Sequence, residues 1–311
     1  MITKIEANEV IACNSYVELC DFSYDYHNLE SSPESGIIHV PTDQLDRFFQ
    51  TNGDNGKNYT LVSPKSDFGV FEQNQSPVWM DMMRWLTMVP YLENSNLASM
   101  GYNDLTLKTR CNTERCRPKH KYSIKCWSFT NATFPSIPSN IKKWYLANSM
   151  IDEAEGIPFG IVPETEEQTV SAYTQDKPES LYVNFQLCNS DRKALIDYFN
   201  AAQLNWVTVR NTPLPFDEYL KEMAKHKFVL CPDGNGPDCY RTWEALYVGS
   251  IPILTKSKAT SYFKDLPVLL LEADDISITH DFLRDKYSEI ISKEWNMEKI
   301  TKSYWKKRIR G

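Results

Sequence analysis

The C-terminal half of the chain alternates short apolar runs with amphipathic stretches. Runs rich in Val, Ile, Leu and Phe predict buried strands. Between the runs, apolar residues recur every three or four positions, as Leu195, Ile196 and Phe199 do, and this spacing predicts helices with one buried face. Strands that alternate with helices indicate a parallel sheet covered on both faces. The predicted strands are 181–187, 206–211, 227–232, 251–255 and 267–272, and the predicted helices are 191–202, 216–226 and 240–248.

The N-terminal half shows the same alternation in a less regular form. Residues 78–92 have apolar residues at helical spacing, and their Met and Trp stripe predicts a core helix rather than a cofactor site. Residues 164–179 are polar, acidic and without a period, which predicts a linker between two lobes. The predicted strands of this half are 8–20, 58–63, 141–148 and 156–163.

The length of the chain supports a division into lobes. A single hydrophobic core stops growing near roughly 250–300 residues, and this chain has 311 residues. We therefore expect an N-terminal domain over residues 1–165, a C-terminal domain over 166–285, and a final helical segment over 286–311. The predicted fold class is α/β, with two Rossmann-like domains.

Charge and composition exclude some classes of protein. The net charge of -7 and the pI near 5.4 argue against a protein that coats nucleic acid, because phosphate binding needs a positive field. The first twenty residues lack the basic start of a signal peptide, and no run reaches the ~18 apolar residues of a membrane span. Eight cysteines are scattered along the chain. We therefore expect reduced thiols and a cytosolic protein.

One group of cysteines has the residue types that bind zinc. Cys111, Cys116, His120 and Cys126 follow the pattern C-x4-C-x3-H-x5-C. This spacing fits none of the usual tight zinc knuckles, and the segment is rich in Lys and Arg. An ordinary basic loop with buried thiols is the preferred interpretation, and a structural zinc site is the alternative.

The segment Phe228–Leu254 contains the residues best suited to binding a phosphate. A predicted strand ends at Pro232, a loop with Gly234 and Gly236 follows, and a helix is expected to begin near Asp238, which suits an N-cap. Ligands of open α/β sheets bind outside the carboxyl ends of the strands. Glycines there let backbone N–H groups approach a ligand, and a helix N-terminus attracts phosphate.

Arg241 and Glu244 lie three residues apart on the expected helix and therefore share a face. An arginine in the first helical turn can donate two hydrogen bonds to a diphosphate. A glutamate one turn later can accept hydrogen bonds from both ribose hydroxyls. The alternative is an ordinary surface ion pair, worth about 0.2–0.5 kcal/mol. The combination of strand, glycine loop, arginine, glutamate and a second apolar strand favours the binding site.

At these residues the sequence resembles the exostosin-like glycosyltransferases, and more loosely the wider GT-B superfamily. The resemblance rests on a strand ending in proline, a glycine-containing loop, an arginine, a Glu-Ala pair and a Gly-(Ile/Val)-Pro strand start. It is strong over this segment, weaker over the rest of the C-terminal half, and present only in outline before that. In this chain the shared residues are Pro232, Gly234, Gly236, Arg241, Glu244, Ala245, Gly249, Ser250, Ile251 and Pro252.

The resemblance implies a GT-B architecture, in which two Rossmann-like domains face each other and a final helix crosses back to the N-terminal domain. It also implies an inverting sugar transfer without a catalytic metal, and the chain shows no Asp-x-Asp triplet of the metal-dependent type. The expected donor is a nucleotide-sugar, a UDP-sugar in preference to a GDP-sugar, and the expected acceptor is a glycan or glycoprotein. Many relatives are Golgi proteins with a membrane anchor, so a cytosolic version encoded by a virus or bacterium would fit this chain better.

The resemblance further places the residues that bind the donor. Arg241 is expected to stabilise the leaving diphosphate, with Arg192 in support; the alternative for Arg192 is a solvent-facing helix start. The expected donor-binding residues are Arg192, Pro232, Gly234, Asn235, Gly236, Asp238, Tyr240, Arg241 and Glu244.

An inverting transfer also needs a base that accepts the proton of the acceptor hydroxyl. We expect this base in the N-terminal lobe, where Asp67 follows the predicted strand 58–63. Asp21, Asp25 and Glu72 are alternatives. None of the five histidines has a sequence context that singles it out.

Two other functions compete with a transferase. A catalytically silent nucleotide-sugar or glycan-binding module would keep Arg241 and Glu244 but lack a productive base. An NAD-dependent enzyme is disfavoured because no G-x-G-x-x-G motif opens an N-terminal βαβ unit.

Overall fold

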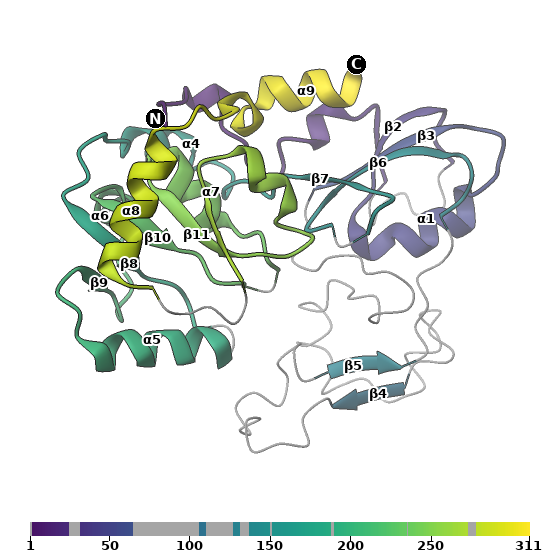
Figure 1. Ribbon diagram of the computed structural model, residues 1–311. Coiled ribbons are helices and arrows are strands. Elements are labelled where there is room, and N and C mark those ends of the chain that lie inside the picture. The colour runs from purple at the N-terminus through teal and green to yellow at the C-terminus, as the bar shows by residue number, and fades with distance from the viewer. Residues whose placement is uncertain are drawn as a thin grey trace.

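Two parallel α/β sheets form the framework of the protein. The computed structural model describes residues 2–24, 32–64, 106–109, 127–130, 137–149, 151–187, 190–234, 236–272 and 278–311. Within these ranges, each sheet has five strands, and every pair of neighbouring strands is parallel. Figure 1 shows the two sheets in separate lobes, with the short antiparallel pair β4 (Thr106–Thr109) and β5 (Trp127–Thr130) apart from both. The predicted α/β fold class with two Rossmann-like sheets is confirmed.

The N-terminal sheet has the strand order β1-β2-β3-β6-β7. Helix α1 (Leu45–Asn52) covers one face, and the ring of its Phe48 packs edge-on against Tyr24 and Tyr59. The sheet consists of β1 (Phe22–Ser23), β2 (Gly36–His39), β3 (Tyr59–Ser63), β6 (Ile141–Ala147) and β7 (Glu155–Ile157).

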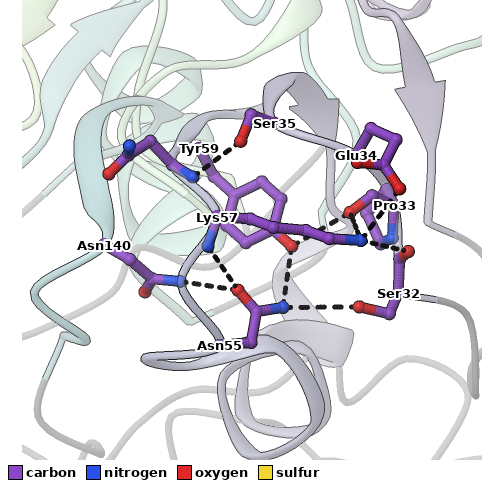
Figure 2. Close-up of polar contacts among 9 residues, drawn as sticks. Ser32, Pro33, Glu34, Ser35, Asn55, Lys57, Tyr59 and Asn140 are labelled. Carbon is purple, nitrogen blue, oxygen red and sulfur yellow. Dashed lines mark hydrogen bonds and ion pairs between the residues drawn. The ribbon is translucent and has the colours of Figure 1, made fainter.

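Polar side chains hold together the amino ends of β2, β3 and β6 (Figure 2). Lys57 donates hydrogen bonds from Nζ to the carbonyls of Ser32 and Pro33 and forms an ion pair with Glu34. Asn55 donates to the hydroxyl of Tyr59, and its own Oδ1 accepts from Asn140. Ligands of parallel sheets bind at the carboxyl ends of the strands, whereas this network lies at the amino ends. We therefore assign it a structural role, which is to hold together the segments that lead into β2, β3 and β6.

The C-terminal sheet has the strand order β12-β11-β10-β8-β9. Strand β9 lies on one side of β8, and the later strands β10, β11 and β12 lie on its other side. The reversal lies between β8 and β10, and in open α/β sheets ligands bind at this switch point. Helices α5 (Ser190–Ala202), α6 (Phe216–Ala224) and α7 (Tyr240–Tyr247) connect the strands. The strands are β8 (Glu179–Val183), β9 (Val207–Val209), β10 (His226–Leu230), β11 (Ile251–Thr255) and β12 (Leu269–Leu271).

The two lobes share one hydrophobic core. Val62 and Tyr145 of the N-terminal sheet belong to the same buried cluster as Val229 and Trp243 of the C-terminal lobe. The expected linker 164–179 is not an unstructured connection, because it contains helix α4 (Glu166–Ser171), whose Thr169 and Val170 are buried. The few apolar residues of this polar segment are the ones that enter the core. The domain boundaries near residues 165 and 285 stay predictions.

The C-terminal end of the chain crosses back to the N-terminal lobe, as expected. After α8 (His280–Ile291), helix α9 (Lys302–Arg310) runs along one side of the molecule toward the N-terminal sheet (Figure 1). Arg308 donates two hydrogen bonds to Glu155, and Arg310 forms an ion pair with Asp21. These contacts join the last helix to β7 and to the residue before β1.

Two predicted strands of the N-terminal half are wrong or too long. Residues 8–20 form the 3-10 turns η1 (Ala7–Glu9) and η2 (Val17–Leu19) with isolated bridges at Val10 and Ala12. The apolar pattern there reflects burial between the lobes, where the Ile11 N–H donates to the hydroxyl of Tyr247, rather than strand pairing. The strand expected over 156–163 is the shorter β7. The helix expected over 78–92 lies outside the described residues.

Candidate functional site

A cavity of about 650 Å³ lies where the carboxyl ends of β8, β9 and β10 meet the start of α7. This is the switch point of the C-terminal sheet, so the strand order alone places it at the expected ligand side. Loops after three strands and the first two turns of α7 form its wall. Its lining residues are Phe159, Asn184, Phe185, Gln186, Leu187, Arg192, Arg210, Asn211, Thr212, Pro213, Leu214, Phe216, Tyr219, Gly234, Gly236, Asp238, Cys239, Tyr240, Arg241 and Glu244.

Arg241 and Glu244 both face this cavity from α7, as their spacing predicted. The guanidinium carbon of Arg241 lies 5.7 Å from the centre of the Phe185 ring. Its Nε is buried and has no hydrogen-bond partner among the described residues. A buried N–H without a partner costs about 1–3 kcal/mol, and this one belongs to a guanidinium at the cavity wall that an anionic ligand could contact.

Glu244 is held by a tyrosine from the neighbouring helix. It is 5% exposed, and its Oε2 accepts a hydrogen bond of 2.8 Å from the hydroxyl of Tyr219 on α6. Burial raises the pKa of Glu244, while Arg241 and the Tyr219 hydroxyl oppose that rise. The contact leaves lone pairs on the carboxylate for a ligand at the cavity wall.

Arg192 binds the glycine loop rather than presenting all its donors to the cavity. Its Nε, Nη1 and Nη2 donate to the carbonyls of Asp233, Gln186 and Pro232, at 3.0, 3.2 and 2.8 Å. A Cβ on Gly234 would lie 3.1 Å from Nη2, so a side chain at this position would crowd Arg192 and require it to shift slightly. The alternative of a solvent-facing Arg192 is wrong, because the residue is 5% exposed.

Asp238 is not the N-cap of α7. The helix begins at Tyr240, and the N-cap position is Cys239, which makes no side-chain capping bond. Asp238 is instead buried between the lobes, where its carboxylate accepts hydrogen bonds from the Phe159 N–H at 2.9 Å, the Trp243 Nε1–H at 2.8 Å and the Tyr262 hydroxyl. Burial raises its pKa to about 7, and these three donors limit the rise.

The backbone of Asp238 makes a second connection between the lobes. Its N–H donates to Asn148 Oδ1 at 2.7 Å, and its carbonyl accepts from Asn148 Nδ2 at 3.2 Å. Asn148 follows β6 of the N-terminal sheet. The residue before the N-cap of α7 is therefore fixed against the opposite lobe, and with it the helix that carries Arg241 and Glu244.

The remaining predicted residues fall into three groups. Gly236 and Tyr240 line the cavity with the residues above, whereas Pro232 contributes its carbonyl to Arg192 without lining the cavity. Asp21, an alternative base, accepts from the Ile37 N–H and Arg310 on the N-terminal lobe and does not line the cavity. The described ranges do not include Asn235, Asp67, Asp25, Glu72 or the motif Cys111, Cys116, His120 and Cys126, so these predictions stay open.

Several residues that line the cavity were not predicted from the sequence to belong to a site. Phe185 and Leu187 were expected inside a strand, but β8 ends at Val183, and both residues line the cavity instead. Tyr219 was treated only as part of an amphipathic helix. The signal that could have found them is their position directly after β8, or on the helix after β9, at the carboxyl side of the sheet.

Comparison with protein families gives one match that covers the site. Residues 164–309 match the RXYLT1 C-terminal domain. The match spans just under half of the chain and includes β8 to β12, α7 and every described residue of the cavity except Phe159. No curated protein matches the chain.

Two solved structures show a distant similarity. One is described as "Trehalose-6-phosphate from E. coli bound with UDP-2-fluoro glucose", with a TM-score of 0.38 and 8% identity. The other is described as "OtsA apo structure", with a TM-score of 0.37 and 8% identity. Each match covers 89% of this chain and 72% of the other chain. Similarity at these values says nothing about what the cavity binds.

The described residues contain no candidate for a membrane-spanning helix or for a metal-binding group. None of the helices that the structure describes is long and apolar enough to cross a membrane. Over the same ranges, no group of three His, Cys, Asp or Glu side chains is placed to hold a metal ion.

Proposed function

We propose that this protein is a glycosyltransferase that binds a nucleotide-sugar in the cavity between the carboxyl ends of β8, β9 and β10. The observation that carries the proposal is the Arg241 side chain, which lines the cavity beside the start of α7 and whose buried Nε–H lacks a partner among the described residues. A diphosphate would accept hydrogen bonds from this guanidinium and lie at the positive end of the helix. The match of residues 164–309 to the RXYLT1 C-terminal domain covers this same segment.

The diphosphate end of the ligand would lie against the glycine loop. Arg192 draws the carbonyls of Pro232 and Asp233 to one side of that loop. In a trans peptide the N–H points opposite to the carbonyl, so the N–H groups of Asp233 and Gly234 face away from Arg192. Part of the loop is closed internally, because the Gly234 N–H donates to the Gly236 carbonyl. The phosphate oxygens would therefore be bound mainly by Arg241 and the start of α7.

The ribose would lie next to Glu244. Its carboxylate is oriented by Tyr219 and keeps acceptor lone pairs toward the cavity. Two adjacent hydroxyls can donate to one carboxylate, and such charge-assisted hydrogen bonds are about twice as strong as neutral ones. The apolar wall of Phe185, Leu187 and Leu214 suits the faces of a base or sugar.

The finer assignments rest on the sequence and on the resemblance to exostosin-like glycosyltransferases. In an inverting transfer, an acceptor hydroxyl attacks the anomeric carbon, the bond from that carbon to the diphosphate breaks, and a base accepts the hydroxyl proton. Arg241 and the helix N-terminus would stabilise the charge that develops on the leaving diphosphate. Asp67 is the residue we propose as base, and a glycan as acceptor. A UDP-sugar is the proposed donor.

Nucleotide release tests this function directly. The protein is incubated with UDP- and GDP-sugars, with and without oligosaccharide acceptors, and the free nucleoside diphosphate is measured. Release that depends on the protein and rises with an acceptor supports the transferase. Tight binding without release would instead indicate the catalytically silent module, and no binding of any nucleotide-sugar would contradict both.

Glu244→Ala is expected to weaken donor binding about tenfold or more, because it removes the acceptor of the ribose hydroxyls. The control is Glu218→Ala, an exposed glutamate on α6 that does not line the cavity. Calorimetric titration with UDP gives both affinities. Equal affinity of wild type and Glu244→Ala would remove the ribose assignment.

A further inference from the structure

A chain of hydrogen bonds leads from the rim of the cavity to Asn184, the first residue after β8. Arg210 donates two hydrogen bonds from Nε and a third from Nη2 to the carboxylate of Glu222. The Tyr182 hydroxyl donates to Glu222 Oε2 at 2.8 Å. Asn184 Nδ2 in turn donates to the oxygen of that hydroxyl at 2.8 Å. None of these four residues belongs to the predicted donor-binding set.

The chemistry of the chain fixes which way the amide of Asn184 points. Burial raises the pKa of Glu222, but the hydrogen bonds from Arg210 and Tyr182 outweigh burial and hold it below its ordinary value. Glu222 is thus an acceptor only, and the single proton of the Tyr182 hydroxyl goes to it. The hydroxyl oxygen then needs a donor from Asn184, and only the amide nitrogen can provide one. Oδ1 is therefore turned away from Tyr182.

Asn184 lines the cavity on the side where we place the nucleoside. Its side chain is half-buried and belongs to the cavity wall, and no described residue donates to its Oδ1. The Tyr182 ring lies 6.3 Å from that of Tyr219, which orients Glu244. Asn184 is thus linked to the ribose side of the site, and the loop from Arg210 to Leu214 lines the same cavity.

We propose that Asn184 determines nucleobase specificity by presenting a fixed hydrogen-bond acceptor to the ring nitrogen edge of the base, with Arg210, Glu222 and Tyr182 as positioning residues. This inference rests on the proposed function, because it assumes that a nucleotide occupies the cavity. A ring N–H, as in uracil or guanine, can donate to Oδ1. Cytosine and adenine carry a lone pair at the corresponding ring nitrogen, and two facing acceptors repel.

Binding of UDP and CDP separates these cases, because the two pyrimidines have the same size. Wild type is expected to bind UDP about tenfold or more tightly than CDP, the effect of one lost hydrogen bond to a site that cannot rotate. Asn184→Ala should reduce this ratio to about one. Both nucleotides should still bind, with the affinity for UDP lowered toward that for CDP. GDP and ADP form a second pair of equal size and should follow the same order.

Tyr182→Phe tests the positioning chain without touching the ligand. It leaves Asn184 in place but removes the hydroxyl that fixes its amide, so the amide can present either edge. The ratio of UDP to CDP affinity should fall toward one, and the drop should come mainly from tighter binding of CDP. Tyr198→Phe, at an exposed phenol on α5, is the matched control and should keep the wild-type ratio. Thermal melts of each variant show that the fold is intact.

The outcomes distinguish this inference from the proposed function. If no nucleoside diphosphate binds to wild type, the proposed function fails and the inference fails with it. If nucleotides bind but CDP binds as well as UDP, or if Asn184→Ala keeps the wild-type ratio, only the inference is overturned. If Asn184→Ala removes the preference but Tyr182→Phe does not, the positioning role is overturned.

Discussion

Arg241→Ala should lower the rate constant for sugar transfer about 100-fold and change the melting temperature little. Removing one donor to a developing negative charge costs about 10²–10³ in kcat. The wild-type guanidinium lacks a partner at its buried Nε and is flanked by Phe185. Its removal relieves an unsatisfied donor in the unliganded protein but also removes the positive charge beside the buried Glu244, and these two effects on stability oppose each other. Initial rates of nucleotide release with saturating donor measure the effect, and calorimetry gives the melting temperature.

Two further variants separate charge from geometry at this position. Arg241→Lys keeps the positive charge but loses the planar fork that binds two oxygens at once, so it should recover only part of the rate. Arg284→Ala, which removes an exposed arginine paired with Asp281 on α8, is the control and should leave the rate unchanged. Wild-type turnover in Arg241→Ala would contradict the assignment of the diphosphate to this side chain.

Arg241 also acts on Glu244, so the two variants are not independent. The positive charge opposes the rise in the pKa of Glu244 that burial causes. Without Arg241, the pKa of Glu244 should rise further, and a neutral carboxyl group is a weaker acceptor for ribose hydroxyls. The double variant Arg241→Ala with Glu244→Ala should therefore lose less donor affinity than the sum of the two single losses.

The C-terminal half of the fold could be predicted because its local and global signals agree. Apolar runs such as 251–255 coincide with strand β11, and the helix expected over 191–202 differs from α5 by one residue. Parallel strands are buried on both faces, so they read as continuous apolar segments. The face shared by Arg241 and Glu244 follows from helical spacing alone, and the cavity contains both.

The missed parts of the site depend on contacts between segments far apart in the chain. The sequence shows that Arg192 starts a helix, but not that the carbonyls of Gln186, Pro232 and Asp233 converge on it. Asp238 fits an N-cap by residue type, yet Phe159 and Trp243 provide donors that the helix terminus does not. At both positions, hydrogen bonds to residues distant in the sequence determine the side chain's role, and the local residue preference does not. The strand prediction for residues 8–20 is wrong for a related reason, because burial between the lobes produces the same apolar pattern as a buried strand.

Asp238→Asn should remove part of the pH dependence of stability. The pKa of Asp238 is raised to about 7 in the folded protein by burial, against about 3.9 in an unfolded chain. Between these values the folded state binds the extra proton, so the contribution of Asp238 is fully present below about pH 4 and is lost as the pH rises through 7. At 1.36 kcal/mol per pKa unit, wild type loses about 4 kcal/mol over this window from this one group.

The difference in unfolding free energy between wild type and Asp238→Asn isolates this effect, because other carboxyl groups titrate equally in both proteins. Asparagine cannot accept from Phe159, Trp243 and Tyr262 together, since its amide nitrogen faces at least one N–H donor. The variant should therefore be less stable than wild type near pH 4.5, and the gap should narrow or change sign by about pH 8. Urea unfolding at both pH values measures it, with Asp197→Asn on the surface of α5 as control. A gap that stays constant with pH would show that Asp238 is ionised throughout, held so by its three donors and by the positive end of α7.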